Sequence, residues 1–222
     1  MTVERFGSGG RTRTYYLFVP ESATAVPPLL VLLHGSGRNG KSLIDPWRPF
    51  AKKEGIILAA PDATTPEGWR IPEDGPDFLH DLVELLAYQK NIDRRRVYLF
   101  GHSAGAGHAL AMAVLESQYF AAVSAHAGTL DRSLYANMAG AARKTPIAIW
   151  VGTDDALFPL PAVRATRDAL KARGFDAKLT ELAAHTHAYY DRAPYINQEV
   201  WTFLRQQVLP SDPVYQEYQF SH

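Results

Sequence analysis

The chain has 222 residues, 46% of them hydrophobic and 21% charged, and its 23 basic and 23 acidic residues give a formal net charge of zero. This length suits one domain, expected to span residues 1–222, and the balanced charge argues against a nucleic acid or an anionic membrane as partner. The absence of cysteine excludes disulfides and thiolate metal sites. Because residues 1–10 are polar and no stretch approaches the roughly twenty apolar residues of a membrane span, we expect a soluble, cytoplasmic protein.

Short apolar runs alternate with longer helical patterns along the chain. Helices are expected at 77–89, 162–173 and 199–208. The predicted strands are residues 15–19, 29–33, 56–60, 97–100, 121–124, 147–151 and 178–182. This alternation predicts an α/β fold with a mostly parallel sheet covered by helices on both faces, in which ligands bind beyond the carboxyl ends of the strands.

The first candidate functional residue is Ser103, in the sequence Gly-His-Ser-Ala-Gly at residues 101–105. This segment follows the predicted strand 97–100 and precedes a run of small residues with helical character. A sharp strand-to-helix turn needs small residues on both sides of a strained corner, and it exposes the side chain at that corner. We therefore interpret Ser103 as a nucleophile.

A serine hydroxyl is a poor nucleophile, so it needs an imidazole to take its proton and a carboxylate to orient that imidazole. The acid is expected in the loop after the strand at 147–151, where Asp154 and Asp155 are adjacent. The base is expected after the last predicted strand, where His185 and His187 lie. The order serine, acid, histidine is that of α/β-hydrolases.

A glycine-rich loop at residues 34–40 leaves an early predicted strand. We expect a backbone N–H near Ser36 and the N–H of Ala104 to form an oxyanion hole, which stabilises the negative charge that develops on a carbonyl oxygen. His34 is interpreted as a structural residue that braces this loop.

Several segments besides residues 101–105 carry a resemblance to the small serine esterases of the α/β-hydrolase fold. They are residues 34–35, 61–63, 91–93, 152–155 and 187–190. The chain resembles the feruloyl esterase, polyhydroxybutyrate-depolymerase-like and phospholipase/carboxylesterase families. The resemblance implies a triad of Ser103, Asp155 and His187, because Asp155 precedes Pro159 by four residues and His187 precedes an x-Tyr-Tyr sequence. Asp154 and His185 stay open as alternatives.

The aromatic residues expected to line the substrate pocket are chiefly Trp69, Phe158, Tyr189 and Tyr190. The connection between residues 124 and 147 is too short for a separate lid domain. An open, shallow site follows, which favours small esters over long-chain lipids.

The sequence thus predicts a serine carboxylesterase that acts on small or aryl/short-acyl esters without a cofactor or a metal. A small-molecule ester is the only partner expected. The alternatives are a serine peptidase or thioesterase with the same triad, a non-catalytic binding protein of the hydrolase fold, and metal-dependent hydrolysis through His185 and His187.

Overall fold

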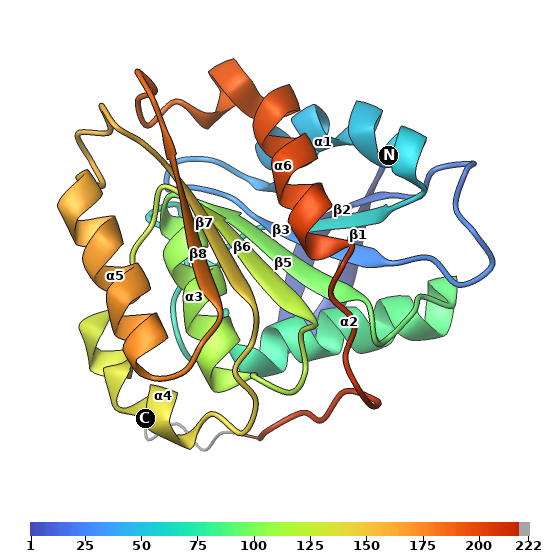
Figure 1. Ribbon diagram of the computed structural model, residues 1–222. Helices are drawn as coiled ribbons and strands as arrows, with labels where there is room; N and C mark the ends of the chain where they lie inside the picture. The colour runs from blue at the N-terminus through green and yellow to red at the C-terminus, as the bar shows by residue number, and fades with distance from the viewer. Residues whose placement is uncertain (218–222) are drawn as a thin grey trace.

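Eight strands form one sheet in the order β1-β2-β4-β3-β5-β6-β7-β8, in a computed structural model that describes residues 1–217 (Figure 1). The hairpin of β1 and β2 joins the sheet antiparallel to β4, and the other six strands are parallel to one another. The strands are β1 (Thr2–Ser8), β2 (Arg11–Phe18), β3 (Leu29–Leu33), β4 (Ile57–Pro61), β5 (Val97–His102), β6 (Ala122–His126), β7 (Ile147–Gly152) and β8 (Ala177–Leu182). The predicted fold class, with its mostly parallel sheet, is confirmed.

Helices cover both faces of this sheet (Figure 1). One face carries α1 (Gly40–Glu54) and α6 (Ala193–Leu204). The other face carries α2 (Pro76–Lys90), α3 (Ala104–Leu115), α5 (Leu160–Ala172) and the short α4 (Asn137–Gly140). Two 3-10 helices, η1 (Arg132–Tyr135) and η2 (Tyr189–Arg192), lie in loops.

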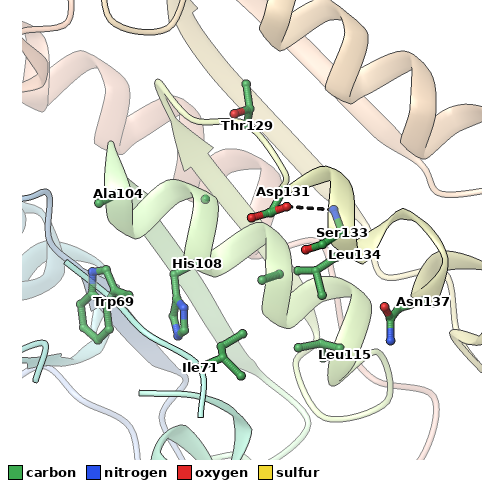
Figure 2. A pocket seen from close by; sticks show the side chains of 12 residues that line it. Trp69, Ile71, Ala104, His108, Leu115, Thr129, Asp131, Ser133, Leu134 and Asn137 are labelled. Carbon is green, nitrogen blue, oxygen red and sulfur yellow. Dashed lines mark hydrogen bonds between the residues drawn. The ribbon is translucent and has the colours of Figure 1, made fainter. Parts of the chain in front are cut away.

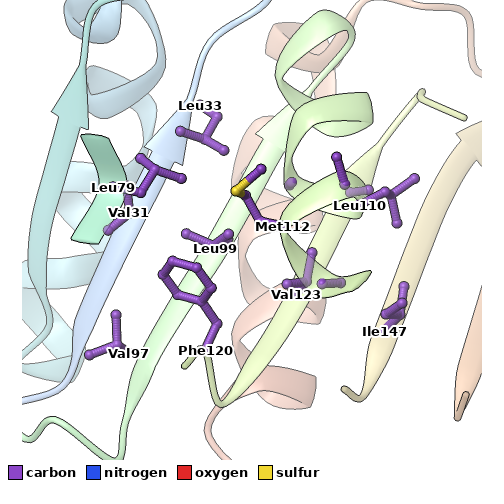
Figure 3. Packing of buried hydrophobic residues seen from close by; sticks show 14 of the residues in the cluster. Val31, Leu33, Leu79, Val97, Leu99, Leu110, Met112, Phe120, Val123 and Ile147 are labelled. Carbon is purple, nitrogen blue, oxygen red and sulfur yellow. The ribbon is translucent and has the colours of Figure 1, made fainter. Parts of the chain in front are cut away.

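Two hydrophobic layers result, one on each face of the sheet. In β3, Leu29, Val31 and Leu33 point to the layer of α2 and α3, whereas Leu30 and Leu32 point to the layer of α1 and α6. All five side chains are fully buried. Because side chains alternate across a strand, an uninterrupted apolar run is typical of a strand that is covered on both faces. Figure 3 shows part of the layer against α3.

Apart from the four-residue helices α4, η1 and η2, two elements were not predicted from the sequence, β1 and α1. β1 is an edge strand whose side chains are mostly exposed, so its residues carry no apolar run. α1 contains Pro46 and Pro49, which normally argue against a helix interior. It is nevertheless well terminated, since the Asn39 side chain accepts from the Ser42 N–H at 3.1 Å and Gly55 ends the helix at φ 71°.

The helix expected at 199–208 begins six residues earlier, at Ala193, and ends at Leu204. Pro194 lies in its first turn, where a missing N–H costs nothing. Between β6 and β7, the chain carries only η1 and α4, so the described residues hold no separate lid domain, as expected. No helix within residues 1–217 has both the length and the apolar character needed to cross a membrane.

Candidate active site

Ser103 stands at the corner between β5 and α3, where its backbone adopts φ 58° and ψ −121°. The two glycines of the motif make this corner possible. A Cβ at Gly101 would lie 2.0 Å from the Gly105 carbonyl oxygen, and a Cβ at Gly105 would lie 1.9 Å from the Leu33 carbonyl oxygen. Any side chain at either position would therefore displace backbone, and the strained Ser103 is held with its hydroxyl free of the helix.

A row of hydrogen bonds joins Ser103 to a histidine and an acid from two other loops. Ser103 Oγ lies 3.0 Å from His187 Nε2, and His187 Nδ1 lies 2.9 Å from Asp155 Oδ2. The other oxygen, Asp155 Oδ1, accepts from the backbone N–H groups of Leu157 and Phe158, both at 2.9 Å. The Asp155 side chain is fully buried, whereas that of His187 is 23% exposed. The imidazole thus sits between a fixed carboxylate and the hydroxyl, at the edge of solvent.

The alternative acid and base lie outside this row. Asp154 is exposed, and its Oδ1 accepts from the Thr153 hydroxyl at 3.1 Å. His185 is buried, and its Nε2 lies 3.2 Å from Nε2 of His126. The two histidines of the 185–187 segment therefore face different partners and do not converge as a metal pair. Within residues 1–217, no three His, Asp or Glu side chains are arranged to hold a metal ion.

The loop after β3 packs directly on the corner. A Cβ at Gly35 would lie 3.1 Å from Ser103 Cβ. His34 braces the loop, since its Nε2 accepts from the Ala63 N–H at 3.1 Å, and burial is the main cause that lowers its pKa. The backbone N–H groups of Ser36 and Ala104 have no acceptor among residues 1–217. One of these unpaired donors lies in the loop that packs on the corner, and the other directly follows Ser103.

A buried carboxylate, Asp74, fixes the loop between β4 and α2. It accepts from the Arg13 guanidinium, from the backbone N–H and hydroxyl of Thr64 at 2.9 and 2.7 Å, and from the Arg70 N–H at 2.9 Å. This loop carries Trp69, whose indole N–H donates to the His34 carbonyl at 2.8 Å. The anchored loop backbone and this hydrogen bond together fix the Trp69 ring.

Two hollows flank the corner. The first, of about 910 Å³, contains Ser103 and His187, and charged side chains from Arg38, Asp154 and Asp191 edge it. Tyr190 lines this hollow, as expected for a pocket residue. Arg38, which the sequence did not single out because it offers only a lone cation in a glycine-rich loop, lies at the same edge with its guanidinium 5.2 Å from the Tyr190 ring centre.

The second hollow is a groove of about 550 Å³ along α3, from Ala104 to Leu115 (Figure 2). Its lining on one side includes Trp69 and Ile71, and on the other Thr129, Asp131, Ser133, Leu134 and Asn137. Trp69 stacks on His108 with ring centres 5.3 Å apart, and His108 Nε2 bonds to the Asp74 carbonyl at 2.8 Å. The groove therefore has a rigid aromatic wall, and Trp69 lies where a pocket residue was expected.

Two of the expected pocket residues, Tyr189 and Phe158, lie elsewhere. Tyr189 is fully buried against Phe100, and its hydroxyl bonds to Asn197, so its prediction as a substrate contact is wrong. Tyr189 and Tyr190 are neighbours in η2, where one side chain points inward and the other outward, and the sequence does not say which. Phe158 stacks on His187 with ring centres 5.6 Å apart and lines neither hollow. It packs against the histidine instead of forming a pocket wall.

Comparisons with known proteins agree with this architecture. The model of the dienelactone hydrolase family matches residues 59–201. Feruloyl esterase B of Neurospora crassa is 28% identical over 158 residues, which make up 66% of this chain and 53% of that protein. The chain thus spans about half the length of this relative.

Solved structures with the same fold include esterase PE8, with a TM-score of 0.72 at 23% identity, covering 87% of this chain and 98% of that one. They also include LpqC, a poly(3-hydroxybutyrate) depolymerase from Bordetella parapertussis, with a TM-score of 0.71 at 19% identity, covering 91% and 90%. These similarities establish the α/β-hydrolase fold.

Proposed function

The chain belongs to the dienelactone hydrolase family, and we propose that it is a serine carboxylesterase that hydrolyses small esters with an aryl or short acyl group. The observation that carries the proposal is the row of hydrogen bonds from Ser103 through His187 to Asp155. The reaction class is supported by the similarity to a fungal protein named as a feruloyl esterase.

The proposed reaction proceeds through an acyl-enzyme. His187 Nε2 takes the proton of Ser103 as Oγ attacks the ester carbonyl carbon, and the N–H groups of Ser36 and Ala104 receive the resulting oxyanion. Collapse of this intermediate expels the alcohol, which takes the proton from His187. Water then repeats the sequence and releases the acid. Asp155 holds the Nδ1 proton and stabilises the imidazolium in both steps.

The two hollows divide the substrate between them. The leaving alcohol must face His187, so it occupies the larger hollow, whose charged edge suits a polar alcohol. The acyl group points away from His187 and past Ala104, toward the groove along α3. The floor there includes Gly107 and Ala111, and the wall includes Trp69, so a flat or short apolar acyl group fits best.

The decisive experiment combines a covalent probe with turnover. Wild type and Ser103→Ala are treated with a fluorophosphonate, measured as intact mass, and assayed with p-nitrophenyl acetate, butyrate and octanoate. We expect one adduct and rapid turnover of the short esters, both lost in the variant. Turnover that persists in Ser103→Ala would mean a different nucleophile, and an inert wild type would favour a binding role.

Two further arms separate the related reactions. Matched thioesters and peptide anilides are compared with the oxygen esters, and the carboxylesterase assignment requires the highest kcat/KM for the oxygen esters. Activity that survives a chelator would remove metal-dependent hydrolysis.

A further inference from the structure

Three buried histidines form a continuous row of imidazoles beneath the serine corner. His102 Nδ1 lies 3.1 Å from His126 Nδ1, and His126 Nε2 lies 3.2 Å from His185 Nε2. Their residue exposures are 5%, 0% and 3%. The register of β5 and β6 pairs His102 with His126, so the first contact follows from the sheet itself. We call these three residues the histidine row.

The donors and acceptors of this row are strictly limited. A neutral imidazole has one N–H and one bare nitrogen, so the central His126 donates to one neighbour and accepts from the other. The two hydrogen bonds of the neutral row therefore run in the same direction, donated either from His102 toward His185 or from His185 toward His102. One added proton can be accommodated, because a charged His126 can donate at both ends. A second proton would leave two N–H groups facing each other and would break a hydrogen bond.

The row joins the segments that carry the proposed nucleophile and base. His102 directly precedes Ser103, and the backbone N–H of Ser103 donates to the His126 carbonyl at 3.0 Å. At the far end, His185 lies two residues before His187. The His102 and His187 rings also face each other, with centres 4.9 Å apart. One end of the row thus contacts the ring of the proposed base, and the other end lies on the same segment of chain as the base.

We propose that the histidine row is a positioning device, in which His126 fixes the base His187 relative to Ser103 through its hydrogen bonds to His102 and His185. This role rests on the proposed esterase function. His126 itself touches neither substrate nor the reacting atoms, so it acts through its two neighbours. A displacement of about 1 Å in such a constellation costs about a hundredfold in rate, which is why an indirect support can matter.

The row is suited to this role because its rings stay neutral. Burial, followed by the nearby His187, lowers the pKa of His102 to about 4. Burial also lowers the pKa of His126 well below its ordinary value, and it lowers that of His185. The titratable and charged groups that face the row are Arg38, Asp155, His187, Tyr189, Tyr190, Asp191 and Arg192. A neutral row adds no charge that would oppose the imidazolium formed on His187.

The test compares two substitutions of His126 that separate hydrogen bonding from packing. His126→Phe keeps the ring shape and removes both nitrogens, whereas His126→Gln loses the shape and keeps one donor and one acceptor. His80→Gln, on the outer side of α2, is the matched control. Rates are expressed per active site titrated with fluorophosphonate, so a loss of folded protein does not count as a loss of turnover.

We expect His126→Phe to lower kcat roughly ten- to hundredfold while KM changes little, and His126→Gln to recover part of kcat. The control should match wild type. A Phe variant with wild-type kcat, or one that outperforms the Gln variant, would reduce the row to packing and overturn the proposal. If His126→Phe does not fold, His185→Phe and His185→Gln provide the same comparison from the end of the row.

Nitrogen NMR of protein labelled at histidine tests the row without any turnover. At pH 7.5 we expect neutral signals from His102, His126 and His185, and a shift of the His187 signals in His126→Phe that is absent in His80→Gln. A charged ring in the row, or unmoved His187 signals, would overturn the proposal. An inert wild type with these NMR properties would instead refute the esterase function and leave the positioning of His187 established.

Discussion

Two buried carboxylates, Asp74 and Asp155, lie in different loops and have different partners. Both side chains are fully buried. Asp74 is paired with the guanidinium of Arg13, which is a permanent cation. Asp155 is paired with two backbone N–H groups and with His187, the imidazole that takes the serine proton in the proposed reaction.

The two acids therefore differ in role. The charge of Asp74 supports the structure, whereas the charge of Asp155 is available to the proposed reaction. The charge of Asp74 is already neutralised, so its hydrogen bonds serve to hold the loop that carries Trp69. The charge of Asp155 has no fixed counter-ion and can stabilise a cation that appears on His187. Burial alone does not distinguish the two acids, whereas the nature of the partner does.

The largest expected effect is the loss of activity in Asp155→Asn. An amide facing His187 no longer stabilises the imidazolium and favours the wrong tautomer, so kcat should fall about 10⁴-fold. The matched control is Asp154→Asn, the exposed neighbour, which should keep most of the activity. Steady-state kinetics with p-nitrophenyl acetate measure both. Equal losses in the two variants would contradict the distinction drawn between Asp155 and its neighbour.

Asp74→Asn should instead reduce stability, because it leaves the buried Arg13 without its counter-ion. Breaking a buried pair in this way costs about 3–5 kcal/mol of the free energy of unfolding. Asp45→Asn, which breaks the exposed pair with Lys41, should cost less than about 1 kcal/mol. Urea unfolding provides the measurement. If Asp74→Asn is as stable as wild type but has lost turnover, Asp74 takes part in the chemistry. The distinction between Asp74 and Asp155 is then wrong.

His108, which bonds to the Asp74 carbonyl, should also make the stability of the protein depend on pH. Burial lowers the pKa of His108 from 6.5 to about 4. The unfolded chain therefore binds this proton more readily, so the stability contribution is fully present above pH 6.5 and is lost as the pH falls toward 4. The loss is roughly 3 kcal/mol. The free energy of unfolding, measured from pH 7 to pH 4, should decline less steeply in His108→Gln than in wild type. Equal slopes in the two proteins would contradict this prediction.

The smallest expected effect concerns the groove. Trp69→Ala removes its aromatic wall, so the preference for p-nitrophenyl phenylacetate over the acetate should fall by about 1 kcal/mol, or five- to tenfold in the ratio of kcat/KM. Trp69→Phe keeps a ring and should retain more of this preference. An unchanged ratio in Trp69→Ala would place the acyl group outside the groove.

Much of the fold could be predicted from the sequence because the central strands are apolar on both faces. Residues 29–33 and 147–151 are uninterrupted apolar runs, which predict buried strands, and the loops after such strands hold the Asp155 and His187 that the structure brings to Ser103. β1 gives no such signal, since an edge strand needs only a backbone partner and its side chains stay in solvent.

The site was predictable as far as residue type and chain order allow. The choice of Asp155 over Asp154 depends on which side chain turns inward toward the Leu157 and Phe158 N–H groups, and adjacent residues in a loop do not reveal this. The same holds for Tyr189 and Tyr190. The histidine row could not be predicted for another reason. His102, His126 and His185 are separated by 24 and 59 residues, and they meet only because β5 aligns with β6 and the loop after β8 brings His185 to His126.

The strained backbone at Ser103 also affects which residue is favoured at this position. A non-glycine residue held at φ 58° and ψ −121° costs about 1–3 kcal/mol, and glycine would adopt the same conformation almost without strain. Selection for stability alone would therefore favour glycine here. Under the proposed function, the serine is retained because its hydroxyl reacts, although a glycine would give a more stable and chemically inert protein.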